Sequence, residues 1–215
     1  MDTKLTYTLD DLENLDFTGS SLAVIGSPID HSLSPAMHNA ALNKLRAKDT
    51  HFNDWAYYRF EIPAEDLSHA LPHFHARNFI GINLTVPHKV LALQSLKSVS
   101  AHAKNMGAVN TLLRLESGYA GYNTDGYGLR RGLQIDLDQS LKGSTVLIIG
   151  SGGAARAAAV QALLDGCDQL FIGNRSTVRL EELVESLSTL AGDHCVQTFK
   201  LDQLPKNLPQ AGVAI

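Results

Sequence analysis

Residues 145–155 read Thr-Val-Leu-Ile-Ile-Gly-Ser-Gly-Gly-Ala-Ala, and this stretch decides the fold class. Its first five residues form the continuous apolar run typical of a buried parallel strand. The glycines that follow fit the pattern G-x-G-x-x-A and lead into an alanine-rich segment that we expect to be helical. Gly150 allows a tight turn, Gly152 lets a pyrophosphate approach the backbone, and Ala155 permits close helix–strand contact. We predict a dinucleotide-binding turn with pyrophosphate at the helix N-terminus, a plain glycine-rich turn being the alternative.

The end of the next predicted strand indicates which dinucleotide. An NAD enzyme commonly places Asp or Glu there to hold the ribose 2′-hydroxyl. This chain instead has Asn174-Arg175-Ser176-Thr177-Val178-Arg179. Two guanidinium groups and a hydroxyl suit a 2′-phosphate, which arginine binds through paired hydrogen bonds. The segment therefore predicts NADP(H), and a solvated helix start capped by Ser176 or Thr177 is the alternative.

Strands and helices alternate on both sides of the glycine motif. In the second half we predict strands at 145–149, 169–173, 194–199 and 213–215, with helices at 154–164 and 178–190. In the first half we predict strands at 22–26, 55–62, 79–84 and 109–115, with helices at 35–47, 63–76 and 87–96. This order predicts an α/β chain with mostly parallel sheets.

A polar, glycine-rich stretch at 118–128 marks the predicted domain boundary. We predict a substrate-binding catalytic domain over residues 1–125 and a Rossmann-type NADP-binding domain over residues 126–215. The second domain has about four strands, where a dinucleotide fold usually has six. We therefore expect the natural protein to continue beyond Ile215.

Polar side chains follow the predicted strands of the first half. They are Ser32, Ser34, Asn83, Thr85, Asn110, Thr111, Asn123 and Asp125. Loops after the carboxyl ends of parallel strands line a common crevice, so these groups should converge there. Hydroxyls suit a carboxylate and amides suit ring hydroxyls, which predicts a small polyhydroxylated acid as ligand. A helix cap for Ser34 and a turn or cap for Asp125 are the alternatives.

Lys89 follows the strand at 79–84 and stands two residues after Pro87, a residue suited to open a helix. The peptide dipoles of a first helical turn disfavour a cation. A lysine placed there exchanges its proton more readily, as acid/base chemistry requires. We predict that Lys89 and Asp125 meet at the reacting oxygen; a solvated surface charge is the alternative for the lysine.

Composition excludes several classes of function. The net charge of −4 gives no support to nucleic-acid binding, and no apolar run approaches the ~20 residues of a membrane span. The N-terminus lacks a signal-peptide profile, and Cys167 and Cys195 form no CxxC pair, so we expect a cytoplasmic protein. His73 and His75 lack ligand partners at zinc spacing, and we predict no metal site. The oligomeric state stays open, a homodimer included.

Six motifs, in order, resemble the shikimate dehydrogenase family. They are AVIGSPIDHSLSPAMHN (23–39), GINLTVPHK (81–89), GAVNT (107–111), GYNTDG (121–126), GSGGA (150–154) and NRSTVR (174–179). The resemblance implies that Ser32, Ser34, Thr85, Asn110 and Asp125 hold shikimate and that Lys89 is the acid/base residue. It implies pyrophosphate binding by Gly150, Ser151, Gly152, Gly153 and Ala154, and 2′-phosphate binding by Asn174, Arg175, Ser176 and Arg179.

The implied activity is the reversible NADPH-dependent reduction of 3-dehydroshikimate to shikimate, in chorismate and aromatic amino-acid biosynthesis. Leu84, Ser151 and Ser176 are small departures from the family pattern. Family members also continue with further coenzyme-domain segments and helices that return to the substrate domain. A quinate/shikimate dehydrogenase using NAD or NADP and a chain that binds ligand without turnover stay open as alternatives.

Overall fold

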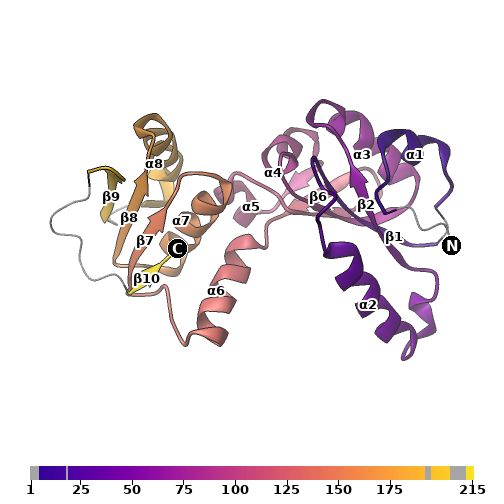
Figure 1. Ribbon diagram of the computed structural model, residues 1–215, viewed down its shortest axis with the longest axis horizontal. Helices are drawn as coiled ribbons and strands as arrows, with labels where there is room; N and C mark the ends of the chain where they lie inside the picture. Colours follow the sequence, from indigo (N-terminus) through magenta and orange to yellow (C-terminus); the bar gives the residue numbers. More distant parts are fainter. Residues whose placement is uncertain (1–4, 18, 192–194, 204–211) are drawn as a thin grey trace. The chain divides into compact units, whose positions relative to one another are not determined.

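The computed structural model describes residues 5–17, 19–191, 195–203 and 212–215 (Figure 1). The chain forms two compact units, Met1–Asn123 and Thr124–Ile215. The boundary expected from the sequence lay two residues later, after Asp125. Each unit is built around a sheet of its own.

The first unit contains a six-stranded sheet of order β2-β1-β3-β5-β6-β4. Its strands are β1 Ser21–Gly26, β2 Ala56–Glu61, β3 Phe79–Leu84, β4 Ser98–Val99, β5 Thr111–Arg114 and β6 Tyr119–Tyr122. β1 pairs in parallel with β2 and β3, and β4 pairs in parallel with β6. β5 runs antiparallel to both of its neighbours.

The hairpin β5–β6 is a feature that the sequence interpretation missed, because β6 lies inside the glycine-rich stretch taken as a boundary. Gly121 looks like a strand breaker, yet a Cβ at this position would lie 2.4 Å from Leu96 and 2.8 Å from Val109. The glycine is therefore there for close packing within a strand. The loop ends at Gly118, whose φ of +76° suits the turn.

The helices of the first unit are α1 Leu9–Asn14, α2 Ser34–Arg46, α3 Leu67–Ala76, α4 His88–Leu91 and α5 Ala101–Met106, with 3-10 turns η1 Thr50–Phe52, η2 Ala64–Asp66 and η3 Ala92–Ser95. The single helix predicted for 87–96 is wrong: it divides into α4 and η3. The carbonyl of Lys89 accepts a 2.7 Å hydrogen bond from the amide of Val109, which draws this turn toward β5 and ends α4 after four residues.

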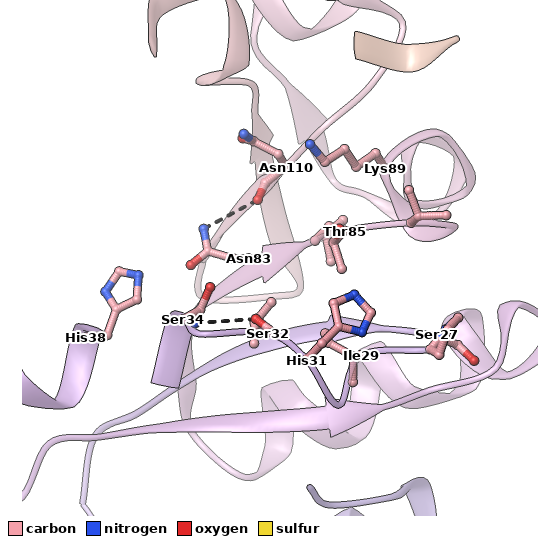
Figure 2. A pocket seen from close by; sticks show the side chains of 14 residues that line it. Ser27, Ile29, His31, Ser32, Ser34, His38, Asn83, Thr85, Lys89 and Asn110 are labelled. Atoms are coloured by element: carbon pink, nitrogen blue, oxygen red, sulfur yellow. Dashed lines mark hydrogen bonds between the residues drawn. The ribbon is translucent and has the colours of Figure 1, made fainter. Parts of the chain in front are cut away.

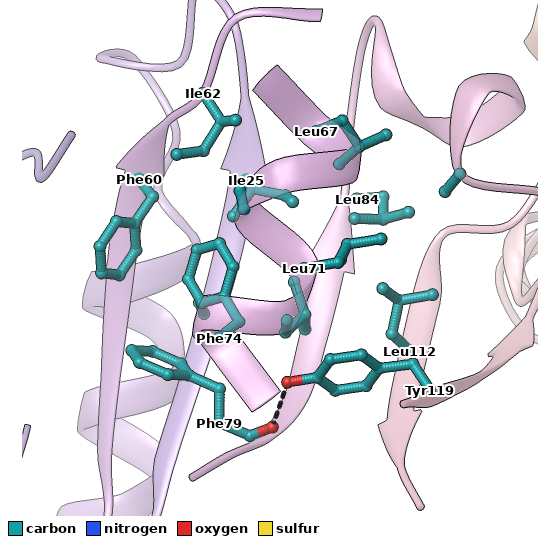
Figure 3. Packing of buried hydrophobic residues seen from close by; sticks show 14 of the residues in the cluster. Ile25, Phe60, Ile62, Leu67, Leu71, Phe74, Phe79, Leu84, Leu112 and Tyr119 are labelled. Carbon is teal, nitrogen blue, oxygen red and sulfur yellow. Dashed lines mark hydrogen bonds between the residues drawn. The ribbon is translucent and has the colours of Figure 1, made fainter. Parts of the chain in front are cut away.

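Alternate residues of β1 build two cores on opposite faces of the sheet. Ala23 and Ile25 pack beneath α1 and α3 with Phe60 and Phe74, in the cluster that Figure 3 shows. Val24 packs on the other face, in a cluster that Leu42 of α2 completes. Helices therefore cover both faces of the sheet, α1 and α3 on one side and α2 on the other.

The second unit has a fully parallel sheet of order β10-β7-β8-β9. Its elements are α6 Asp125–Asp136, β7 Thr145–Ile149, α7 Gly153–Asp165, β8 Gln169–Asn174, α8 Thr177–Ala191, β9 Cys195–Lys200 and β10 Val213–Ala214. The predicted parallel α/β order is confirmed. His194 of the predicted strand 194–199 and Ala211 near the chain end lie outside the described residues. In the described parts of the chain, every helix is too short or too polar to cross a bilayer.

Candidate active site

A cavity of about 600 Å³ opens in the first unit at the end of the sheet (Figure 2). Five predicted substrate residues line it: Ser32, Ser34, Thr85, Lys89 and Asn110. Its wall also includes Ser27, His31, His38 and Asn83. The structure therefore brings together, around one space, polar groups that are spread widely over the sequence of the first unit.

Two different strand directions place these groups. The serines follow β1 and Thr85 follows β3, so the carboxyl ends of two parallel strands supply them, as predicted. Asn110 arrives by another route, because it precedes β5, which runs antiparallel to β3. The start of β5 lies beside the end of β3, where the amide of Leu84 donates to the Asn110 carbonyl over 2.9 Å. The expected placement holds for Asn110, but the expected reason does not.

The serine loop between β1 and α2 is held from below. Ser34 is the first residue of α2 and not its cap, and the Ser32 hydroxyl accepts from the Ser34 amide over 3.4 Å. The Arg59 guanidinium, on β2, donates to the carbonyls of Asp30 and Ser32. Arg59 thus positions the loop that carries both hydroxyls. Sequence reasoning missed it, since β2 contributes no residue to the cavity itself.

Lys89 is the second residue of α4 and its side chain extends toward Asn110 (Figure 2). The prediction from the helix dipole has little support at Lys89, because a helix of four residues sums few peptide dipoles. What singles Lys89 out is its place on the cavity wall, where it is half-buried.

The neighbouring His88 anchors α4 in the protein interior. Its side chain is fully buried, and Nε2 lies 2.8 Å from the Ile62 carbonyl, so Nε2 carries the proton and donates. Burial lowers the pKa of His88, and the hydrogen bond to Ile62 opposes that shift. His88 is therefore neutral, and its buried hydrogen bond fixes the turn that carries Lys89.

His38 on the cavity wall packs against Tyr57, an aromatic side chain that does not line the cavity and that the sequence interpretation did not single out. His38 of α2 stacks on Tyr57 of β2, with ring centroids 4.2 Å apart and planes 4° apart. The Tyr57 hydroxyl donates to the side chain of Asn83. The MHN letters of the α2 motif were the available signal for His38, whereas nothing in the sequence marks Tyr57.

The predicted coenzyme turn lies in the second unit between β7 and α7. Gly150 has a φ of +125°, which side-chain-bearing residues rarely adopt, and its amide donates over 2.7 Å to the Gly173 carbonyl. Gly152 differs, because a Cβ there would meet no atom of the described residues within 4 Å. Gly153 and Ala154 begin α7, and both are exposed. An open space above a helix N-terminus is what a pyrophosphate requires.

The predicted 2′-phosphate segment lies beside this turn because β7 and β8 are adjacent parallel strands. The Asn174 amide group donates to the Ser151 hydroxyl over 2.7 Å and to the Ser176 carbonyl over 3.3 Å, which joins the two segments. Ser176 accepts from the Arg179 amide over 3.4 Å, so it does contribute to capping α8. Arg175 and Arg179 are exposed. The donor set fits an anionic dinucleotide.

Asp125 is the first residue of α6 and is half-buried in the second unit. The predicted meeting of its carboxylate with Lys89 joins residues of different units, and it stays a prediction.

Comparison with known proteins gives the family. Residues 24–112 match the family described as shikimate dehydrogenase substrate binding domain, and residues 133–215 match shikimate / quinate 5-dehydrogenase. A crystal structure of shikimate 5-dehydrogenase from Thermus thermophilus, in complex with shikimate, is similar with a TM-score of 0.74 and 34% identity. The match covers 91% of this chain and 68% of that one. The chain belongs to the shikimate dehydrogenase family.

Two further members of this family show how much of their length the chain covers. Shikimate dehydrogenase (NADP(+)) from Geobacter metallireducens is 40% identical over 190 residues, which are 87% of this chain and 64% of that protein. A second Thermus thermophilus structure, in complex with NADP(H) and shikimate, has a TM-score of 0.71 at 35% identity, covering 84% of this chain and 63% of that one. The chain thus spans slightly less than two thirds of the length of these two relatives.

Proposed function

We propose that this chain carries the catalytic centre of an NADP-dependent shikimate dehydrogenase, which reduces 3-dehydroshikimate reversibly to shikimate in chorismate and aromatic amino-acid biosynthesis. The observation that carries the proposal is the cavity of the first unit, whose wall combines Ser32, Ser34, Thr85, Lys89 and Asn110 in a chain of this family. A volume of about 600 Å³ lies in the range of small-molecule sites.

In this proposal the two serine hydroxyls donate to the substrate carboxylate. The side chains of Thr85, Asn83 and Asn110 bind the ring hydroxyls, because hydroxyl and amide groups can donate and accept with each alcohol. Arg59 keeps the serine loop in place from its hydrogen bonds to the loop carbonyls. A site of this kind distinguishes substrates by the hydroxyls they carry, since an unmatched buried polar group is costly.

Bound NADPH would supply the hydride that reduces the ketone carbon. Lys89 gives a proton to the alkoxide oxygen as it develops, and takes one back in the reverse direction. Asp125 accepts a hydrogen bond from the same hydroxyl and orients the lysine. The residues Gly150, Ser151, Gly152, Gly153 and Ala154 hold the pyrophosphate, and Asn174, Arg175, Ser176 and Arg179 hold the adenosine 2′-phosphate.

The ligands of two relatives support the choice of shikimate and NADP(H). One Thermus thermophilus structure is in complex with NADP(H) and shikimate, and the Geobacter metallireducens protein is named for NADP(+). The arginines at positions 175 and 179 occupy the segment where a 2′-phosphate would bind, which favours NADP over NAD.

The deciding experiment combines calorimetric titration of shikimate with an assay of shikimate oxidation by NADP⁺, followed through the absorbance of NADPH. We expect saturable shikimate binding, and turnover that Lys89→Ala lowers by about 10²–10⁴ in kcat with a modest change in KM. Lys104→Ala, an exposed lysine on α5, is the matched control.

Quinate and NAD⁺ form the comparison arms of that assay. A higher kcat/KM for quinate than for shikimate, or for NAD⁺ than for NADP⁺, would show that the protein is a quinate/shikimate dehydrogenase instead. Binding without turnover would identify a chain that holds ligand only. An unchanged kcat in Lys89→Ala removes the lysine from the mechanism.

We further propose that the protein is cytoplasmic, because a chain of 215 residues with only two cysteines fits the reduced thiols of cytosolic proteins. A homodimer is the assembly to test first, because cyclic dimers are the commonest soluble oligomers. Light scattering on the purified chain decides it through the measured mass.

A further inference from the structure

Three side chains with metal-binding chemistry meet on the surface formed by α1 and α3. They are Glu13, His69 and His73, whose ligand atoms all lie within 4.8 Å of one another. Glu13 Oε1 is 2.9 Å from His69 Nε2 and 3.7 Å from His73 Nε2. None of the three lines the cavity described above. The cluster is therefore separate from the proposed active site.

The geometry of the cluster comes from the packing of two helices. His69 and His73 are four residues apart on α3, so their side chains stand one turn apart on the same face. Their ring centroids are 4.7 Å apart. Glu13 faces them from α1, which is anchored through Leu12, a fully buried member of the main core.

The backbone around Glu13 is held in place independently of its carboxylate. The Arg77 guanidinium, just past the end of α3, donates to the carbonyls of Glu13 and Leu15 and lies 3.8 Å from the Asp16 carboxylate. Arg77 therefore fixes the end of α1 against α3, and the Glu13 carboxylate stays directed at the two imidazoles. Such prior positioning of ligands reduces the entropy lost when an ion binds.

We propose that Glu13, His69 and His73 form a site for Zn²⁺. Two imidazole nitrogens and one carboxylate oxygen are a zinc ligand set, with water completing four-coordination. Ligand atoms around tetrahedral zinc stand roughly 3.4 Å apart, so small side-chain rotations bring the three into place. His69 has the freedom for this, since its side chain is 61% exposed. Mg²⁺ and Ca²⁺ fit this site poorly, because both ions prefer oxygen ligands and two of the three ligand atoms here are nitrogens.

Zinc at this position would tie the N-terminal helix to the body of the first unit. α1 has only six residues, and its own hydrogen bonds contribute little stability. An ion bridging α1 and α3 stabilises the folded chain in proportion to the logarithm of its concentration over Kd. The water position would remain open to an exchangeable ligand.

The sequence analysis predicted no zinc site at these residues, and the fold explains why. That prediction weighed His73 with His75, whereas His75 points elsewhere and its Nε2 lies 3.0 Å from the Leu115 carbonyl. The partners of His73 are His69, one turn earlier, and Glu13, which is distant in sequence and comes close only through packing of α1 on α3.

The test is a calorimetric titration of the whole chain with ZnCl₂ after treatment with a chelator, at about pH 7.5, where imidazoles are mostly neutral. We expect one ion per chain. Replacing even an outer residue of a metal site typically weakens binding 10- to 100-fold, so His69→Gln, His73→Gln and Glu13→Gln should each weaken it by at least ~10-fold. His51→Gln, an exposed histidine on η1, should bind zinc like the wild type.

Two further readouts separate a zinc site from a simple Glu–His ion pair. Co²⁺ in place of Zn²⁺ should give the visible absorption of a tetrahedral site in wild type and in His51→Gln only. Zinc should raise Tm in the same two proteins, with circular dichroism confirming that every variant folds. Absence of saturable zinc binding, or equal zinc affinity in wild type and His73→Gln, overturns the proposal. None of these readouts depends on dehydrogenase activity.

Discussion

The hydroxyl of Tyr57 donates a 2.7 Å hydrogen bond to Oδ1 of Asn83. This bond fixes the orientation of the Asn83 amide, and its Nδ2 then lies 3.4 Å from both the Asn110 carbonyl and the Thr111 hydroxyl. Burial raises the pKa of Tyr57 far above its usual range, and the nearby Ser34 hydroxyl opposes this. The phenol therefore remains a donor throughout the pH range in which the protein works.

Replacing Tyr57 by phenylalanine should loosen the ligand site while leaving the fold intact. The change removes the donor to Asn83 and costs about 0.5–1.5 kcal/mol, which corresponds to a 2- to 10-fold weaker shikimate affinity if the amide turns. Tyr58→Phe is the matched control, because the next residue of β2 faces the opposite core, with Tyr7 and Phe17. Calorimetry on both variants should show the loss of affinity in Tyr57→Phe alone.

The two glycines of the coenzyme turn should respond in opposite ways. Gly150→Ala places a side chain at a φ of +125° and should destabilise the fold by about 1–3 kcal/mol. Gly152→Ser keeps an ordinary φ of −80° and adds a helix-capping side chain, so Tm should not fall. The added atoms occupy the space proposed for pyrophosphate, and NADP⁺ affinity should drop at least ~10-fold. Undiminished NADP⁺ binding by Gly152→Ser would argue against that location.

Arg175 and Arg179 should determine the choice between NADP⁺ and NAD⁺. Each is exposed, so its substitution by alanine should change Tm little. A charged hydrogen bond to phosphate is worth ~1.5–3 kcal/mol, so each change should weaken NADP⁺ by about 10- to 100-fold. NAD⁺ lacks the 2′-phosphate, and its affinity should stay the same. The measurement is the ratio of the two dissociation constants; a parallel loss for both coenzymes would contradict this role.

His88 should make the protein less stable in mild acid. Burial holds its pKa in the folded state below the value of about 6.5 in the unfolded chain. The unfolded state therefore binds more protons than the folded state at low pH. The free energy of unfolding has its full value above about pH 6.5 and falls as the pH drops below that value. Each such group contributes at most ~1.4 kcal/mol per pH unit. His38, whose pKa is also lowered by burial, acts in the same direction.

Denaturant titrations of wild type and His88→Gln between about pH 5 and pH 8 measure this effect. Glutamine can keep the donor to Ile62 but cannot titrate in this range. The difference in the free energy of unfolding between wild type and His88→Gln should be smaller in acid than at pH 8. A stability slope that is the same in both would assign the acid sensitivity to other groups.

Local patterns in the sequence carried much of the fold. The run at 145–149 and the segment at 79–84 became β7 and β3 with the predicted bounds, since both are short apolar stretches bounded by strong turn signals. The same local logic failed at 87–96 and 118–128. A backbone hydrogen bond from Val109 ended the first helix early, and packing against Leu96 placed Gly121 inside a strand.

The sequence by itself determined which groups of the proposed site are polar, which turns need glycine and which family the motifs resemble, because these depend on residue type and short spacing. Only the tertiary structure decided that Asn110 joins the cavity from an antiparallel strand, that Tyr57 and Arg59 support the site, and that Glu13 meets His69 and His73. The physical reason is that such contacts join elements distant in the chain, and their geometry follows from how sheets and helices pack.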